Sequence, residues 1–505
     1  MSHLVRISNM RRFATAFLLL FATHLHAASS YPSRYQWKTI TTEHFLVHFH
    51  QGEDALAHRA AGYAEDAHKQ LSPLVGWSPR ERTHLILTDH VDAANGSATP
   101  FPSNWIEVYV STPGANPTSA IGDYDDWLRL VIHHEYTHIL HLDQARGFSG
   151  AMRKVFGRVP LLAFPEATSP LWMIEGLATL AESETTDAGR LKGTFLDMVL
   201  RTAAIENRFA SESEASGLGP FWPGGNSRYF YGARFLSWLS TTRGADKLTQ
   251  YLHAYSNAIP FRVNASASQV YGQSMKSLWL EWSAEQQRLY KAERDRLAVD
   301  GLTDRQRLTT LGYETVHPLL SPDGTRIAYS HRGPYERPTL RIRNVATGKD
   351  VRVRTVNATS TLSWSADGKS IAYSDLELVE SVSVSSDLYI WDLDGDHSRR
   401  ITQSARLKDP AFSPDGRSLI AVSNQLGRNA LVEVDVATGS IRDVLTPADD
   451  RQFDEPVVSH DGTRIAVAEW RNGSTQIVLY DRSGRLISNL TERFAAALNS
   501  SPRFS

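Results

Sequence analysis

The residues with the clearest capacity for chemistry are two histidines four positions apart with a glutamate beside the first. They lie in the run His134-Glu135-Tyr136-Thr137-His138. On a helix, positions i and i+4 lie one above the other, so both imidazoles can reach one tetrahedral Zn²⁺. Glu135 can then act as general base toward a water at the metal. Apolar residues flank the run and three aspartates precede it, which predicts a buried helix.

A catalytic zinc site needs a third protein ligand, and the sequence offers three candidates. His141 and Asp143 follow on the same helix, but one straight helix can hardly wrap three ligands around one ion. Glu175 lies within a second apolar helical pattern, residues 170–182. Carboxylates are rarely fully buried unless they are paired or bound to a metal. We therefore expect Glu175 to complete the site with the two histidines.

The pairing of His134-Glu-x-x-His138 with Trp-x-x-Glu175-Gly-x-Ala resembles the gluzincin peptidases, close to the M1 aminopeptidase-like group. The resemblance covers about residues 32–300 and implies an α+β zincin-type metallopeptidase domain with Zn²⁺ as cofactor. It makes Glu175 the third ligand and places Glu182 beside a ligating histidine. The segment between His138 and Glu175 is longer than in aminopeptidases, and their Gly-x-Met-Glu-Asn motif is absent. The resemblance thus implies zinc chemistry but not aminopeptidase specificity.

The same family carries a Tyr-x-x-Gly motif further along, and Tyr229-Phe230-Tyr231-Gly232 matches it. This implies that the hydroxyl of Tyr229, rather than that of Tyr231, stabilises the oxyanion. The expected reaction is hydrolysis of a peptide bond in a peptide or protein substrate. It proceeds through a zinc-activated water with Glu135 as general base.

Residues 1–28 predict a secretory signal peptide. Three arginines precede a mostly apolar run at 13–25 that is too short to span a membrane, and Ala27-Ala28 marks the cleavage site. We therefore expect a periplasmic or secreted protein. No other apolar run reaches membrane length, so no transmembrane span is expected apart from this segment.

Composition narrows the function classes further. The 505 residues include no cysteine, which excludes disulfides and cysteine zinc sites and leaves histidine and carboxylate as metal ligands. The length predicts about two to four domains. Removing residues 1–27 removes three arginines and no acid, so the formal charge falls from −2 to −5. With no basic stripe, we expect no nucleic-acid partner.

Residues 32–120 predict an α+β part of the peptidase domain, with strands at 37–40, 44–50, 84–88 and 105–110 and a helix at 55–71. In gluzincins an edge strand just before the zinc helix pairs with extended substrate. The sequence leaves open whether 105–110 is that edge or an interior strand. His44, His48 and His50 lie on one face of a predicted strand and are interpreted as solvated or packed, because no acid or cysteine completes a metal site.

Residues 121–300 predict the helical catalytic part, which holds both zinc motifs. The stretch 147–170 carries glycine, proline and basic residues and predicts a long loop or a short extra helix that shapes the cleft. Residues 182–200 look helical, and a glycine-rich loop at 217–226 precedes the helix of Tyr229.

Residues 305–505 carry an internal repeat. Ser321-Pro-Asp-Gly, Ser365-Ala-Asp-Gly, Ser413-Pro-Asp-Gly and Ser459-His-Asp-Gly recur at steps of 44, 48 and 46. Each precedes a strand and then a further strand pair, which predicts about four blades of an all-β propeller. The Asp-Gly turn supplies the positive φ that a tight hairpin requires. The repeats resemble the TolB-type (PD40, WD40-like) propeller family, a signal strong for fold and weak for function.

Two further expectations concern the propeller. Pro502-Arg503-Phe504-Ser505 repeats the pattern of Pro410 to Ser413, so we expect the propeller to be incomplete here and the chain to continue. The alternative is that the ring closes with four blades and residues 490–505 supply the closing strand. The alternative function is a non-catalytic periplasmic binding or scaffold protein that acts through its TolB-like propeller on a protein partner. Sequence alone leaves both functions open.

Overall fold

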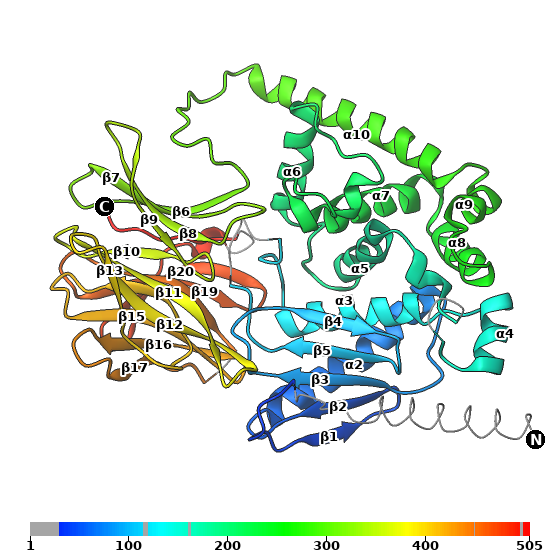
Figure 1. The fold of residues 1–505 in the computed structure, drawn as a ribbon, viewed down its shortest axis with the longest axis horizontal. Helices are drawn as coiled ribbons and strands as arrows, with labels where there is room; N and C mark the ends of the chain where they lie inside the picture. The colour runs from blue at the N-terminus through cyan, green and yellow to red at the C-terminus, as the bar shows by residue number, and fades with distance from the viewer. Residues whose placement is uncertain (1–29, 115–119, 160–162, 449, 495–497) are drawn as a thin grey trace, which may run out of the picture.

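The computed structural model describes residues 30–114, 120–159, 163–448, 450–494 and 498–505. An N-terminal α/β region and a C-terminal β-propeller lie side by side, and the long helix α10 leads from one toward the other (Figure 1). The predicted signal peptide, residues 1–28, lies outside the described residues. Among the described helices, none is both long and apolar enough to cross a membrane.

A five-stranded sheet of order β1-β2-β3-β5-β4 forms the base of the α/β region. Its strands are β1 (Lys38–Thr41), β2 (Phe45–Phe49), β3 (Thr83–Thr88), β4 (Gly96–Thr99) and β5 (Trp105–Tyr109). The three central strands are parallel neighbours, whereas β1 and β4 run antiparallel at the two edges. Residues 105–110 therefore form an interior strand, β5, which is one of the two interpretations left open by the sequence. The edge strand that precedes the helix of His134 and His138 is β4, which begins at the Asn95-Gly96 pair that predicted a turn.

Helices cover this sheet and then form a separate layer (Figure 1). They are α2 (Asp54–Val75), α3 (Trp127–Leu142), α4 (Gly147–Phe156), α5 (Leu171–Thr185), α6 (Thr194–Ile205), α7 (Ser227–Arg243), α8 (Ala245–Asn257), α9 (Val263–Tyr271) and α10 (Met275–Ala298), with short 3₁₀ turns at Pro165–Thr168, Glu214–Ser216 and Gly224–Asn226. The stretch 147–170 contains the short helix. The continuous helix expected over 182–200 is wrong, because α5 ends at Thr185 and a loop containing Gly189 at φ +106° separates it from α6.

The propeller has four four-stranded antiparallel sheets in chain order. They comprise β6–β9 (Glu314–Leu320, Arg326–Arg332, Thr339–Asn344, Asp350–Thr355), β10–β13 (Leu362–Trp364, Ser370–Val379, Ser383–Asp392, His397–Arg400), β14–β17 (Leu407–Phe412, Ser418–Gln425, Arg428–Asp435, Ile441–Leu445) and β18–β21 (Gln452–Val458, Arg464–Arg471, Ser474–Asp481, Leu486–Asn489), followed by the 3₁₀ turn Glu492–Phe494. The four glycines of the repeated Asp-Gly turns have φ of 67–72°. The predicted blades and their turn chemistry are confirmed.

Buried contacts join the propeller to the end of the α/β sheet. Arg406 pairs with Asp89, just after β3, at 2.9 Å and with Asp92 at 2.6 Å. Tyr124 stacks on Trp470 with ring centroids 5.9 Å apart. Its hydroxyl also donates to Gln452 at 2.9 Å. These contacts fix the propeller beside the carboxyl end of β3 and the start of α3.

Candidate metal centre

Helix α3 holds the paired histidines inside the molecule. Asp126 caps its first turn by accepting from the Arg129 N–H at 3.1 Å. Every residue of α3 from Leu130 to His141 is buried, so the helix is packed on all sides. His134 and His138 are 4% and 7% exposed. A polar motif is thus held rigidly within an apolar core.

Helix α5 brings a carboxylate to the same point. Glu175 Oε2 lies 3.2 Å from His138 Nε2 and 3.5 Å from His134 Nε2. That oxygen is buried, and neither approach has the geometry of a hydrogen bond. Within the described ranges, His134, His138 and Glu175 are the one group of three histidine or carboxylate residues whose donor atoms converge, all within 4.8 Å. The residues expected as ligands lie together.

The spacing of these donor atoms suits a tetrahedral ion. Zinc bonds of about 2.0–2.1 Å to nitrogen and oxygen place neighbouring ligands about 3.3 Å apart. The two distances from Glu175 Oε2, 3.2 and 3.5 Å, bracket that value. A buried oxygen without a hydrogen bond, facing two imidazole nitrogens, is therefore what a metal would satisfy.

Glu182 fixes the orientation of one imidazole. His134 Nδ1 donates to Glu182 Oε2 at 2.7 Å, and the carboxylate is fully buried. In the neutral imidazole this hydrogen bond keeps the proton on Nδ1 and leaves the lone pair on Nε2, which faces Glu175. Burial opposes ionisation of Glu182, but the charge of Arg190 and the hydrogen bond from His134 together outweigh it and lower the pKa of the carboxyl.

Glu135 lies directly under the edge strand. A Cβ at Gly96 would stand 2.6 Å from Glu135 Oε1, so the glycine lets β4 approach this carboxylate closely. Burial raises the pKa of Glu135, and the two neighbouring imidazoles partly offset that rise. Asn95 to Ala98 line one cleft of about 260 Å³ together with His134, Glu135, His138 and Glu175, and we call it the metal cleft. The carboxylate, the donor atoms and residues of the edge strand β4 thus line the same space.

Two glycines bring α5 against α7. A Cβ at Gly232 would be 1.9 Å from the Trp172 carbonyl oxygen, and a Cβ at Gly176 would be 2.5 Å from the Gly232 carbonyl carbon. The helix backbones therefore touch at this crossing. This contact brings the ring of Tyr229 within 6.0 Å of the His134 ring. The glycine that follows Glu175 and the one in Tyr-x-x-Gly meet each other.

The two tyrosines of that motif have different surroundings. Tyr229 lines the metal cleft, and burial followed by the nearby Glu175 charge raises its pKa to about 12. Its hydroxyl therefore stays protonated and can donate. Tyr231 is buried at 2% exposure, and its hydroxyl accepts from the Ala210 N–H at 3.3 Å. Only Tyr229 of the two can reach a substrate in the cleft.

Arg190 is the site residue that sequence analysis missed. It lies in the loop between α5 and α6, donates to Glu182 Oε2 at 3.3 Å and stacks 4.7 Å from the Tyr229 ring centroid. Arg190 also lines the cleft. The expected helix over 182–200 hid this residue, although the glycine at 189 was a signal for a break.

Other histidines and acids near the motif point elsewhere. His141 pairs with the buried Glu166 at 2.9 Å, and Asp143 accepts from Trp77 Nε1 at 3.0 Å. His133 contacts the Thr185 hydroxyl at 2.8 Å. The alternative third ligands, His141 and Asp143, are thus engaged away from the cluster.

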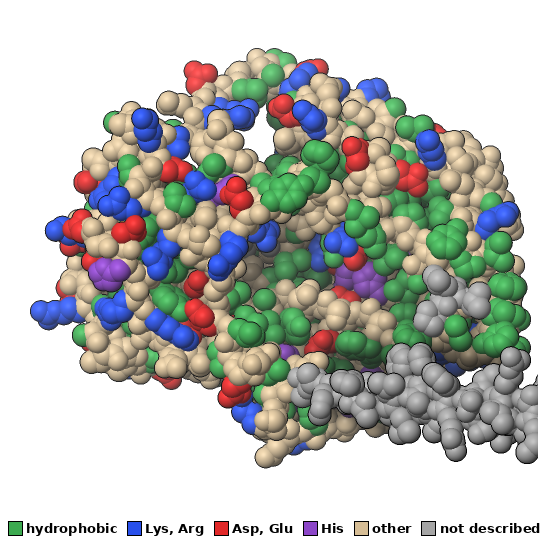
Figure 2. All heavy atoms as spheres, in the orientation of Figure 1, with side chains coloured by type: hydrophobic (Ala, Val, Ile, Leu, Met, Phe, Trp, Pro, Cys, Tyr) green, Lys and Arg blue, Asp and Glu red, His purple; other side chains and the backbone are tan. Residues whose placement is uncertain are grey.

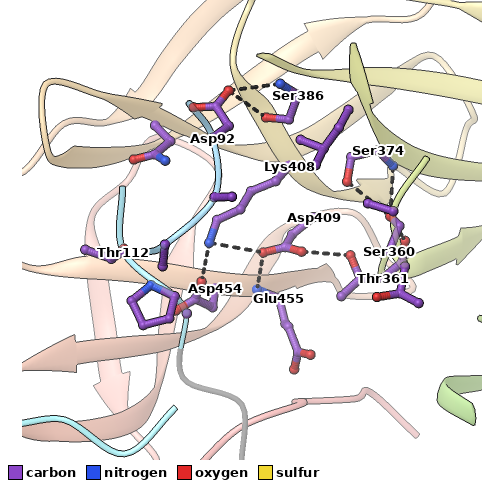
Figure 3. A pocket seen from close by; sticks show the side chains of 18 of the residues that line it. Asp92, Thr112, Ser360, Thr361, Ser374, Ser386, Lys408, Asp409, Asp454 and Glu455 are labelled. Atoms are coloured by element: carbon purple, nitrogen blue, oxygen red, sulfur yellow. Dashed lines mark hydrogen bonds and ion pairs between the residues drawn. The ribbon is translucent and has the colours of Figure 1, made fainter. Parts of the chain in front are cut away.

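A second cavity adjoins the cleft on the propeller side. It encloses about 300 Å³ and shares Ala94 and Ile121 with the metal cleft. Figure 3 shows Lys408 extending into it toward Asp454, at 2.7 Å, while Asp409 accepts from the Thr361 hydroxyl at 2.8 Å. The wall of the metal cleft therefore continues into a polar chamber made largely by the blades.

The family match to known proteins lies in the propeller. Residues 282–505 match the TolB β-propeller domain. "Protein TolB homolog" of Chlorobium luteolum is 32% identical over 126 residues, which cover 25% of this chain and 27% of that protein. Its namesake in Chlorobium chlorochromatii is 34% identical over 127 residues, with the same coverage. The chain therefore spans about a quarter of the length of the curated relatives it matches.

Among solved structures, TolB from Acinetobacter baumannii is 22% identical, with a TM-score of 0.30, over 35% of this chain and 43% of that one. The TolB-like propeller predicted from the repeats is confirmed by the domain match. All residues of the metal cluster precede the matched range, so the cluster rests on its own geometry.

Proposed function

We propose that the chain is an exported zinc-dependent metallopeptidase, with residues 32–300 as its catalytic part and 305–505 as a propeller beside the cleft. The observation that carries this proposal is the convergence of His134, His138 and Glu175 donor atoms within 4.8 Å, next to Glu135. The signal segment and the TolB-like propeller support a periplasmic location.

His134, His138 and Glu175 would hold the zinc ion. A zinc ion so held supplies Lewis-acid polarisation and lowers the pKa of water to about 7. The carboxylate of Glu135 accepts the proton of the attacking water and delivers it to the leaving amine. The Tyr229 hydroxyl donates a hydrogen bond to the carbonyl oxygen of the scissile bond as negative charge develops there.

Strand β4 would position the substrate. Among the described residues it is the last strand of its sheet, so we infer that its outer N–H and C=O groups can pair with an extended peptide. Gly96 places this edge directly over Glu135. A peptide paired with β4 therefore crosses the metal cleft with its backbone near the general base.

The test compares the wild type with Glu135→Gln on a mixed peptide library while zinc is quantified in both. We expect one zinc per chain in each protein and cleavage only by the wild type, because an amide cannot accept the proton. Glu175→Ala should lose zinc. Equal cleavage by wild type and Glu135→Gln, or no zinc in the wild type, contradicts the proposal.

A second candidate function is a binding protein that acts through the propeller. The TolB domain match at residues 282–505 and the chamber around Lys408 favour it. If zinc is bound but wild type and Glu135→Gln are equally inactive on every peptide, the binding function is the better interpretation.

A further inference from the structure

Helix α4 presents its apolar side chains to solvent. Phe148, Val155 and Phe156 are 44%, 69% and 61% exposed, and with Met152 they have the i, i+4, i+7, i+8 spacing of one helix face. The inward side is polar, since Ser149 is buried. A surface helix of a globular protein normally has the opposite arrangement. Figure 1 shows α4 at the rim of the α/β region, far from the propeller.

Exposed apolar residues of one neighbouring loop lie beside the start of α4. Arg146 at the start of α4 donates its N–H to Ser256 O at 3.0 Å, which brings the loop after α8 alongside. That loop exposes Ile259 by 51% and Phe261 by 73%. We call Phe148, Val155, Phe156, Ile259 and Phe261 the α4 surface. Figure 2 shows hydrophobic side chains gathered at the edge of the molecule where Figure 1 places α4 and α8.

The charge around the α4 surface is positive. Residues 144–165 contain four basic residues and no acid, in a chain whose formal charge is −2. Lys154 is exposed on α4 itself. Arg153 and Arg158 both pair with the carboxylate of Asp143, at 3.1 and 3.0 Å. Two positive charges thus meet one negative charge, and this group of three keeps a net charge of +1. An apolar surface with basic residues around it complements a surface whose interior is apolar and whose outer groups are anionic.

We propose that the α4 surface docks onto an anionic lipid bilayer, with α4 lying in the plane of the interface. A basic amphipathic helix binds in this way by burying its apolar face at the headgroup boundary while its cations meet the anionic lipids. Ten residues are too few to span a bilayer, so the contact is peripheral.

Docking would also orient the metal cleft. Arg158 donates to the Pro100 carbonyl oxygen at 3.1 Å, directly after β4, the strand that borders the cleft. A bound α4 therefore holds that end of the cleft at the membrane. This consequence rests on the proposed peptidase function, whereas vesicle binding itself does not.

The test is flotation of the purified full chain with vesicles of phosphatidylcholine alone or mixed equally with phosphatidylglycerol. Mass spectrometry first establishes that the secreted protein lacks the apolar run at 13–25, which would bind lipid by itself. We expect binding to the anionic vesicles that weakens with salt. Phe148→Ser/Phe156→Ser should lower the partition coefficient about tenfold or more, and Lys154→Glu about tenfold.

The matched control is Tyr335→Ser/Leu378→Ser, which removes two apolar side chains, 82% and 69% exposed, from the propeller. It should bind vesicles like the wild type. The proposal is overturned if the wild type stays unbound, binds both vesicles equally, or loses binding equally in the control. A concentration-dependent dimer that Phe148→Ser/Phe156→Ser abolishes, without vesicle binding, assigns the surface to a second copy instead. Zinc content, unchanged in all these variants, keeps this result separate from the peptidase proposal.

Discussion

The α/β region and the propeller are built on opposite principles. In the propeller, the same turn occurs four times, and each copy is closed by contacts within a few residues, such as the Ser413 hydroxyl donating to Asp415 at 2.7 Å. In the α/β region, each functional residue occurs once, and its partners come from distant segments, as with His134 and Glu182 at 2.7 Å. Repetition makes a fold recognisable and tolerant of change. A unique arrangement makes chemistry possible and is correspondingly sensitive.

The largest effect is expected from Gly232→Ala, which disrupts the close crossing of α5 and α7. The added methyl would stand 1.9 Å from the Trp172 carbonyl oxygen, and backbone cannot move aside as a flexible side chain can. We expect a loss of about 3 kcal/mol or more in the free energy of unfolding, together with loss of zinc and activity. Denaturant titration and zinc analysis measure both.

Gly62→Ala is the control for this change, because a methyl at this exposed helical position meets nothing within 4 Å. It should leave zinc content unchanged and stabilise by about 0.5–1 kcal/mol. If Gly232→Ala keeps its stability and zinc, the close crossing of α5 and α7 is not what positions Tyr229.

Tyr229→Phe and Tyr231→Phe compare the two tyrosines of the Tyr-x-x-Gly motif. Removing the hydroxyl that faces the cleft should lower kcat by about 10²–10³, the usual cost of one oxyanion donor, with little change in stability. Tyr231→Phe should do the reverse, costing about 1 kcal/mol of stability by leaving the Ala210 N–H unpaired, while kcat stays close to wild type. Steady-state kinetics beside thermal melts separates them. A larger kcat loss in Tyr231→Phe would reverse the assignment.

Arg190→Ala should weaken zinc binding by about 10–100-fold, because Glu182 would lose the cation that keeps it ionised against His134. Competition with a chelator measures this affinity directly. Arg190→Lys keeps the charge but loses the planar stack on Tyr229, so it should retain most of the zinc affinity and lose more in kcat. Equal zinc affinity in Arg190→Ala and wild type would remove Arg190 from the positioning of the ligands.

The smallest effect on the metal cleft is expected from a substitution in the propeller. Ser413→Ala deletes one of four equivalent turn hydroxyls and should cost about 1–2 kcal/mol of stability. Zinc content and peptide cleavage should stay at the wild-type level, because three similar turns and the whole metal cleft are untouched. A marked fall in zinc content would show that the two regions are coupled more tightly than their separate construction indicates.

The sequence by itself determined the elements whose information is local. The i, i+4 spacing of His134 and His138 placed both on one helix face, and the Asp-Gly turns at regular steps defined four blades. Glu175 could be predicted as a ligand for a similar reason, since an acid within an apolar helix needs a partner. In these cases the chain needs only its own neighbours to specify the geometry.

Tertiary structure decided the rest. The sequence could not tell that β4, rather than β5, is the sheet edge, because edge position depends on which strands pair and not on alternation along one strand. The role of Arg190 could not be predicted from the sequence, because it depends on a loop that folds back onto Glu182 and Tyr229. The outward apolar face of α4 was equally hidden, since hydrophobic spacing predicts a helix face but not what that face meets. Periodicity is a property of a segment, whereas burial and partnership belong to the packed chain.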